Sequence, residues 1–212
     1  QLNTSNLLMK NNLKFFIKEM LDIMISIPIL IFFLPAILII SLLIKIDSKG
    51  PVFFKQNRIG KNLKKFKIYK FRTMTHSLRN TNESVMHLNE ATGPVFKIKN
   101  DPRLTKIGKF LRKYSLDELP QLINIFNRDM NLIGPRPLPD YEVEKMDKNF
   151  SHERHSIRPG ITGLWQISER EKISSFKNWI KLDLKYIHNW SFSLDFKIIL
   201  KTIAIVLGGR GH

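Results

Sequence analysis

The chain has 212 residues, no cysteine and a formal net charge of +17 at pH 7. The lack of cysteine excludes disulfides and thiolate metal sites, and the length predicts one domain with a substantial core. Because 35 Lys and Arg residues outnumber 18 Asp and Glu residues, we expect an anionic partner. Nucleic acid, acidic lipid and phosphorylated substrates are the classes that the rest of the sequence must separate.

A run of almost wholly apolar residues spans positions 21–46 and is long enough to cross a bilayer. Basic residues flank it on both sides, among them Lys14 before it and Lys49 after it. Because cationic flanks prefer the cytoplasm, two such flanks argue against simple spanning. Pro28 and Pro35 interrupt the run, and prolines inside a helix bend it. We therefore expect a re-entrant membrane helix with both ends on the cytoplasmic face, and a straight span is the alternative.

Two short segments after the apolar run predict a β-hairpin. Residues 52–58 form the first candidate strand, and residues 66–72, where apolar and basic side chains alternate, form the second. Gly60, Lys61 and Asn62 lie between them and are typical of a turn. The alternation predicts a small antiparallel hairpin with a basic outer face.

The rest of the chain has mostly helical patterns. Residues 106–114 predict a basic helix, and apolar residues at helical spacing predict a second helix directly after it: Leu119, Leu122, Ile123 and Phe126. Residues 134–139 and 158–163 contain prolines and glycines and predict stiff loops. From Ser174 onward the pattern is helical and amphipathic. The aromatic residues there suit either a membrane surface or ordinary core packing: Trp179, Tyr186 and Trp190.

Two adjacent carboxylates, Asp117 and Glu118, lie at the predicted start of that second helix. Ser115 and Glu118 have the spacing of a capping box, and Pro120 fits the first turn because it lacks an N–H. The exposed N–H groups of a helix start stabilise anions, so we expect Asp117 to stay ionised, as a nucleophile must. Taken alone, the pair is also compatible with simple helix capping.

Five segments in this order, behind a membrane helix, carry a specific family resemblance. They are Gly50-Pro51-Val52-Phe53-Phe54, Tyr69-Lys70-Phe71-Arg72-Thr73-Met74, Leu111-Arg112-Lys113-Tyr114-Ser115-Leu116-Asp117-Glu118-Leu119-Pro120-Gln121, Asn131-Leu132-Ile133-Gly134-Pro135-Arg136-Pro137 and Arg158-Pro159-Gly160-Ile161-Thr162-Gly163. Together they resemble the monotopic phosphoglycosyl transferases, also called bacterial sugar transferases. The resemblance extends from about Phe15 to the glycines at 208, 209 and 211.

The resemblance implies transfer of a sugar phosphate from a UDP-sugar to a membrane polyprenyl phosphate, with release of UMP. Asp117 matches the family's nucleophile, which forms a covalent phosphosugar intermediate. Glu118 matches the second member of the catalytic pair, with metal coordination or proton handling as its open roles. The family requires Mg²⁺, which Asp117 and Glu118 are the candidates to bind, because Mg²⁺ often takes one or two carboxylates together with substrate phosphate.

The resemblance also implies which cations meet the nucleotide and its phosphates: Lys70, Arg112, Arg136 and Arg170. A guanidinium group can contact two phosphate oxygens at once and stabilise developing charge. The bend of the membrane helix falls at Leu34 and Pro35 by alignment from Asp22. Some members of the family have a serine before that proline, and this chain has Leu34 instead.

The expected architecture is therefore α+β and mostly helical, with interfacial amphipathic helices beside the re-entrant helix and the hairpin. Residues 1–47 are expected to form the N-terminal membrane region, and residues 48–212 a cytoplasmic catalytic domain on the bacterial inner membrane. The expected partners are a UDP-sugar, polyprenyl phosphate and membrane lipid. A membrane-anchored nucleic-acid-binding protein and a non-catalytic scaffold are the alternatives; the first has no recognition motif, and the intact Asp117–Glu118 pair argues against the second.

Overall fold

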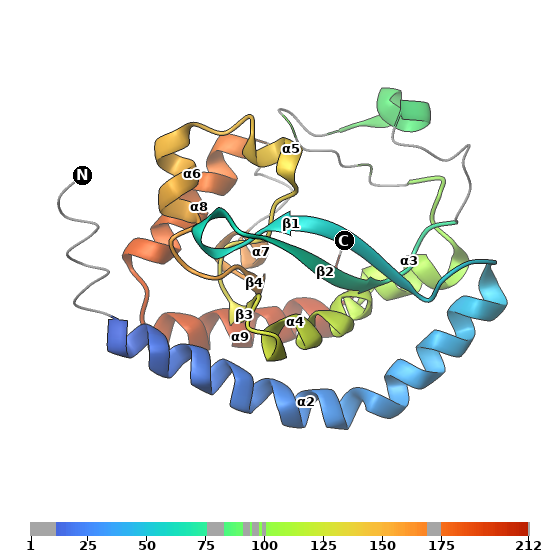
Figure 1. The fold of residues 1–212 in the computed structure, drawn as a ribbon. Coiled ribbons are helices and arrows are strands. Elements are labelled where there is room, and N and C mark those ends of the chain that lie inside the picture. The colour runs from blue at the N-terminus through green and yellow to red at the C-terminus, as the bar shows by residue number, and fades with distance from the viewer. Residues whose placement is uncertain are drawn as a thin grey trace.

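The computed structural model describes residues 12–75, 83–90, 94, 98, 101–168 and 175–211. Within these residues the fold is mostly helical and contains two small sheets (Figure 1). The elements in chain order are α2 (Asn12–Asp47), β1 (Phe53–Ile59), η1 (Lys61–Leu63), β2 (Lys65–Phe71), η2 (Glu83–Leu88), α3 (Lys106–Lys113), η3 (Leu116–Gln121), α4 (Leu122–Phe126), β3 (Asn131–Ile133), α5 (Asp140–Val143), α6 (Lys148–Arg154), β4 (Gly160–Thr162), α7 (Leu164–Ile167), α8 (Phe176–His188) and α9 (Phe192–Leu207).

The N-terminal helix α2 is 36 residues long and apolar enough to cross a membrane. It bows beneath the whole body in one continuous arc (Figure 1). Pro28 and Pro35 both lie inside the helix, which continues through them. In the turn before Pro28, the Ser26 hydroxyl donates to the carbonyl of Ile23 at 2.9 Å. Leu34 and Pro35, the predicted bend, are both exposed within the arc.

Both ends of α2 contact the same body. Near its start, Glu19 forms ion pairs with Lys61 and Arg158. Near its end, Ile40 and Ile44 pack against Phe71 and Leu111. The face of α2 that looks away from the body is an almost unbroken apolar surface of exposed Leu, Ile, Phe and Met side chains.

Arg72, directly after β2, completes the C-terminal end of α2. Its guanidinium donates to the carbonyls of Ile44, Ser48, Lys49 and Pro51 at 3.4, 2.8, 2.8 and 2.6 Å, and to the Ser48 hydroxyl at 2.7 Å. The last carbonyls of a helix have no partner within the helix, so a buried helix end needs such donors. Arg72 supplies five hydrogen bonds and fixes where α2 joins the hairpin.

The predicted hairpin is confirmed. β1 and β2 pair antiparallel, with Phe53 opposite Phe71 and Ile59 opposite Lys65. The free edge of β2 is covered by the fully buried side chain of Asn124 from α4, which accepts from the Tyr69 N–H at 3.1 Å and donates to the Lys67 carbonyl at 2.8 Å. The Asn124 amide thus makes the hydrogen bonds that a neighbouring strand would make with β2, and it holds α4 against β2.

The loop predicted at residues 158–163 was wrong in part, because Gly160–Thr162 forms strand β4, which pairs parallel with β3. The close approach requires glycine: a Cβ on Gly160 would lie 2.1 Å from the Gly134 nitrogen. Short parallel pairs of this kind have too few residues to produce a sequence periodicity. The stiff loop at residues 134–139 is confirmed, and it connects β3 to α5.

The predicted C-terminal helical region is confirmed as two helices, α8 and α9. Trp179 and Tyr186 are buried, so of the two readings left open for them, core packing is the correct one. The exposed apolar side chains lie instead on α9: Phe192, Phe196, Leu200, Ile203 and Leu207. Deeper in the body, Arg154 of α6 and Asp183 of α8 form a fully buried ion pair at 2.7 Å.

We predict that Arg72→Gln lowers the free energy of unfolding by about 3 kcal/mol, because it leaves buried carbonyls of the helix end without donors. Urea unfolding of the protein in detergent micelles measures this change. Lys67→Gln, on the exposed face of the same hairpin, is the matched control and should change the value by less than about 0.5 kcal/mol. Equal effects of the two substitutions would contradict the role of Arg72 at the helix end.

Candidate active site

The acidic pair lies at the start of a short 3₁₀ helix, η3, that continues into α4. Asp117 and Glu118 are in the first turn of η3, as predicted, and Pro120 lies within it. The capping box was wrong: Ser115 has a left-handed backbone (φ 53°), and its side chain makes no capping hydrogen bond. The sharp left-handed turn at Ser115 follows α3 immediately and directs the two carboxylates toward the hairpin.

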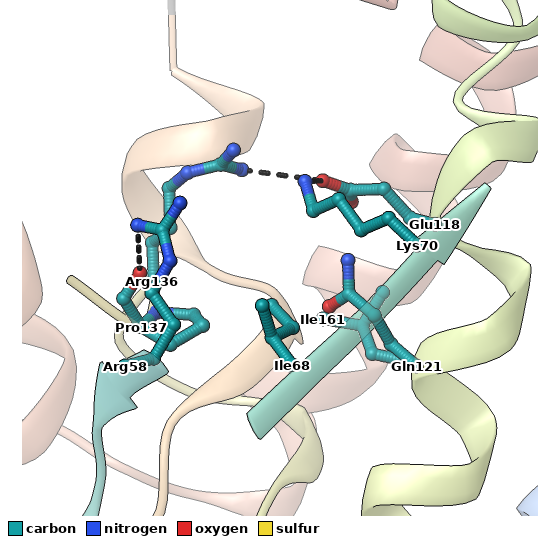
Figure 2. A pocket seen from close by; sticks show the side chains of 8 residues that line it. All are labelled: Arg58, Ile68, Lys70, Glu118, Gln121, Arg136, Pro137 and Ile161. Atoms are coloured by element: carbon teal, nitrogen blue, oxygen red, sulfur yellow. Dashed lines mark hydrogen bonds and ion pairs between the residues drawn. The ribbon is translucent and has the colours of Figure 1, made fainter. Parts of the chain in front are cut away.

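Two predicted cations meet Glu118. Lys70 reaches it from β2, with its Nζ 2.6 Å from Oε1, and Arg136 reaches it from the loop after β3, with its Nη1 3.5 Å from the same oxygen. Figure 2 shows the three side chains converging across a small hollow, with Gln121 of the same short helix beneath them. Lys70 lies on the same face of β2 as Ile68, because side chains two residues apart share a face of a strand. The position of Lys70 is therefore set by the hairpin register.

Arg112, the third predicted cation, lies on α3 one turn before Ser115. Its Nε donates to the Thr73 hydroxyl at 3.1 Å, which ties α3 to the segment after β2. Its positive charge favours the ionised form of Asp117, and the Asp117 carboxylate does the same for Arg112. The structure thus brings Lys70, Arg112 and Arg136 around the acidic pair. Arg170, the fourth predicted cation, lies outside the described residues.

Asp117 is 8% exposed, and its carboxylate accepts no hydrogen bond from the part of the chain that the structure describes. Burial raises the pKa of its carboxyl group to about 6. Lys70 lowers this pKa, the neighbouring Glu118 raises it, and Arg112 and Arg136 lower it. This increase in the pKa of Asp117 is opposite to the decrease expected at a helix start, because the effect of desolvation exceeds the effect of the cations. Asp117 is nevertheless mostly ionised at pH 7 and poorly solvated, which suits a nucleophile.

The cations respond to the same burial. Desolvation lowers the pKa of Lys70, an effect that the negative charge of Glu118 opposes, and burial also lowers the pKa of Arg112. A buried cation with a lowered pKa is stabilised by an incoming anion, because the anion replaces the charge compensation that water no longer supplies. The cluster is therefore suited to receive a phosphate-bearing ligand.

Two arginines that the sequence analysis did not assign to the site hold the loop that carries Arg136. Arg154 donates to the carbonyl of Arg136 itself. Arg58 of β1 donates to the carbonyl of Pro137 at 3.0 Å (Figure 2). It also donates to the side-chain oxygen of Gln56 at 2.7 Å. Burial and the nearby Arg136 lower the pKa of Arg58 to about 10. Among so many basic residues, no sequence signal separates these two from solvated arginines.

The C-terminal tail also contacts the segment that leads to Asp117. The Gly211 N–H donates to the Lys113 carbonyl at 2.8 Å, so the tail folds back onto the junction between α3 and η3. A Cβ on Gly211 would lie 2.2 Å from the Arg112 carbonyl oxygen and 2.8 Å from the Ser115 hydroxyl oxygen. The tail thus packs against the turn that separates Arg112 from Asp117, and Figure 1 shows the C-terminus beside α3.

We predict that Asp117→Asn stabilises the folded protein at neutral pH by up to about 3 kcal/mol, because a pKa near 6 in the fold against an ordinary value near 3.8 means that ionised Asp117 is disfavoured by folding. The sign follows from proton binding. Between about pH 4 and pH 6 the folded state keeps a proton that the unfolded state has lost, so wild-type stability falls as pH rises through this window.

Urea unfolding in detergent at pH 4 and pH 7.5 measures the difference. The asparagine variant should gain stability over wild type at pH 7.5, and the gain should shrink at pH 4. Glu144→Gln, an exposed carboxylate elsewhere, is the control and should show no such pattern. A loss of stability at pH 7.5 in Asp117→Asn would contradict the assigned electrostatics.

Comparison with known proteins adds to this geometry. Residues 13–209 match the family model described as bacterial sugar transferase. The chain is 40% identical to the exopolysaccharide production protein ExoY of Rhizobium meliloti, over 92% of this chain and 87% of ExoY. It is 48% identical to the galactosyl transferase CpsE of Streptococcus agalactiae serotype III, over 76% of this chain. It is 38% identical to the undecaprenyl-phosphate galactose phosphotransferase of Salmonella typhimurium, over 92% of this chain.

The match covers 36% of CpsE and 41% of the Salmonella protein, so this chain corresponds to one part of those longer relatives. ExoY, in contrast, is matched over most of its length. The family model covers nearly the whole chain, including the acidic pair and the three cations around it, Lys70, Arg112 and Arg136. The chain therefore belongs to the bacterial sugar transferase family.

Proposed function

We propose that this protein transfers a sugar 1-phosphate from a UDP-sugar to a membrane polyprenyl phosphate and releases UMP. The observation that carries the proposal is a buried carboxylate, Asp117, beside a second carboxylate and among three cations from three separate elements. The names of relatives support the substrate classes. One is a UDP-glucose:undecaprenyl-phosphate glucose-1-phosphate transferase of Klebsiella pneumoniae, 40% identical over 91% of this chain.

The proposed reaction has two steps at one phosphorus atom. In the first, an Asp117 oxygen attacks the β-phosphorus of the donor, and the bond from that phosphorus to the bridging oxygen breaks. The electron pair leaves with UMP, and a phosphosugar-aspartate remains. In the second, an oxygen of the polyprenyl phosphate attacks the same phosphorus and Asp117 leaves as a carboxylate. The product is a sugar diphosphate lipid, and no proton or co-reactant is needed for the balance.

The cations have a plain electrostatic task in this scheme. A carboxylate and a diphosphate repel each other, so attack requires positive charge around the phosphate oxygens. Lys70 and Arg136 converge on Glu118 from opposite sides of the hollow, where they can exchange part of that contact for phosphate oxygens (Figure 2). Arg112 approaches Asp117 from α3. The hollow has a volume of about 10 Å³, room for about one water molecule, so it can hold no more than a small part of the donor in this conformation.

The same residues fit the Mg²⁺ that the family resemblance implies. Within the described part of the chain, no three His, Asp or Glu side chains gather to hold a metal alone. Mg²⁺ does not need such a group, since it often uses one or two carboxylates and substrate phosphate oxygens. Among the residues that the structure describes, none donates a hydrogen bond to the Asp117 carboxylate, and Glu118 lies next to it in the first turn of η3. When bound, Mg²⁺ would screen the repulsion between these carboxylates and the donor diphosphate.

The membrane arrangement that we propose is re-entrant, with the catalytic part at the cytoplasmic face of the bacterial inner membrane. Two ends of α2 that dock on the same body support it, because a helix that crossed the bilayer would separate its ends by about 30 Å of hydrocarbon. The outward apolar face of α2, the exposed side chains of α9, and Ile123 and Phe126 of α4 supply surface for lipid. Asp117, carried on η3 directly before α4, then lies near the phosphates of the lipid layer.

We predict that Asp117→Asn lowers UMP release from UDP-sugars by on the order of a thousandfold or more, because it removes the nucleophile. The assay contains Mg²⁺ and polyprenyl phosphate, with a panel of UDP-sugars. Glu144→Gln should behave as wild type. With donor alone, mass spectrometry should find a phosphosugar on the peptide that contains Asp117. Robust turnover by Asp117→Asn, or an adduct on another residue, would refute the assignment.

We predict that single cysteines at positions 14 and 49 are labelled from the same side of the membrane. The chain has no cysteine of its own, so the background is zero, and both lysines that are replaced are exposed. An impermeant maleimide applied to intact spheroplasts should label neither Lys14→Cys nor Lys49→Cys, and applied to inverted vesicles it should label both. Labelling from opposite sides would exclude the re-entrant arrangement.

A further inference from the structure

Three charged side chains are buried where α2 meets the body, away from the acidic pair. Lys18 of α2 is 1% exposed and forms ion pairs with Asp22 of the same helix at 2.7 Å and with Asp195 of α9 at 3.2 Å. Asp195 also accepts hydrogen bonds from the Tyr186 hydroxyl at 2.7 Å and the Trp190 indole N–H at 3.0 Å. These groups connect the membrane helix to α8, to α9 and to the segment between them.

Stability alone does not account for this cluster. Burying ions is costly, and well-packed apolar side chains of similar size often serve a fold equally well. An apolar residue cannot, however, accept a hydrogen bond. The Asp22 carboxylate does accept one from the body, from the backbone N–H of Leu132 in β3, at 3.3 Å.

That hydrogen bond lies at the base of the catalytic loop. β3 has three residues and leads directly into the loop that carries Arg136. On one side β3 pairs with β4 through Asn131 and Ile133. The N–H of Leu132, between them, donates to Asp22 of α2. A second contact works in the same direction, because Glu19, on α2 as well, forms an ion pair with Arg158, two residues before β4. Both strands of the parallel pair are thus attached to α2.

We propose that Asp22 is a positioning residue that sets the place of the Arg136 loop through its hydrogen bond to the Leu132 N–H. Lys18 and Asp195 hold the Asp22 carboxylate in place, so the membrane helix and the phosphate-binding loop form one mechanical unit. The proposal rests on the proposed function for its activity readout. Its structural readout, exchange of backbone N–H groups, is independent of any substrate.

The test separates the acceptor oxygen from the charge. Lys18→Met with Asp22→Leu removes one ammonium and one carboxylate together and leaves Asp195 with its two neutral donors. Lys18→Gln with Asp22→Asn is the matched variant, because it removes the same charges but keeps a side-chain oxygen that can accept from Leu132. Ser41→Ala is the control on the same helix, since the Ser41 hydroxyl bonds within the helix to Ile37.

In full-length protein in nanodiscs, we expect the two double variants to unfold at similar urea concentrations. Hydrogen–deuterium exchange over residues 130–139 should quicken in the Met/Leu variant and stay near wild type in the Gln/Asn variant. UMP release, measured as kcat/KM, should fall about tenfold or more in the Met/Leu variant, because small displacements of a positioning group cost activity steeply. It should stay within a few-fold of wild type in the Gln/Asn variant, and Ser41→Ala should match wild type.

If the Met/Leu variant does not fold, Lys18→Gln with Asp22→Ala takes its place, since alanine suits a helix and also lacks the acceptor. Wild-type exchange and turnover in a folded variant without the acceptor would overturn the proposal, as would equal losses in the Gln/Asn variant. Absence of turnover in wild type with every UDP-sugar would refute the proposed function. The exchange comparison would then still decide whether Asp22 positions the loop.

Discussion

The central constraint on this structure is the burial of two adjacent carboxylates, whose negative charges need compensation by nearby cations. Asp117 and Glu118 are adjacent in the chain and mostly shielded from water, so their mutual repulsion and their desolvation both oppose ionisation. The fold answers with Lys70 from β2, Arg112 from α3 and Arg136 from the loop after β3. Compensation is incomplete, since burial still raises the pKa of Asp117 to about 6. A site left in this condition favours additional positive charge beside the acidic pair, such as a cation that accompanies a phosphate-bearing ligand.

Much of the remaining fold holds those three cations in fixed positions relative to the acidic pair. Asn124 fastens β2 to α4, so Lys70 and the acidic pair keep a fixed relation. Arg58 and Arg154 hold the backbone on which Arg136 is carried. Gly211 packs beneath the left-handed turn between Arg112 and Asp117. Each contact joins backbone to a side chain or to other backbone, so the geometry does not rely on flexible surface ion pairs, which contribute little.

Helix α2 has two different faces, one exposed and apolar and one that contacts the body. Outward, it presents exposed apolar side chains along its length. Inward, it presents Lys18, Glu19 and Asp22 to the body near its start, and the carbonyl of Ile44 to Arg72 near its end. A helix that served as a simple anchor would not need buried charges. The inward charges attach the helix to β3 and to Arg158 before β4, and β3 leads into the loop that carries Arg136.

Sequence patterns predicted the elements whose signal is local. The hairpin followed from alternation at residues 66–72, α3 from helical spacing, and the stiff loop at residues 134–139 from its prolines. The capping box at Ser115 failed because a spacing does not reveal a left-handed turn. Strand β4 was missed because a strand of three residues, the first of them a glycine, is too short to show a period. The buried aromatics Trp179 and Tyr186 could not be assigned to core or membrane, since both environments select the same residues.

The sequence by itself indicated the family, the acidic pair and the long apolar helix, because each depends on short segments whose chemistry is visible in their order along the chain. Only the tertiary structure showed that three of the four cations named from the family resemblance lie together around the acidic pair. Lys70, Arg112 and Arg136 are far apart along the chain and meet only after the strands and helices pack. It also raised the pKa of Asp117 against the local expectation, since desolvation depends on everything packed around a group and not on its neighbours in sequence.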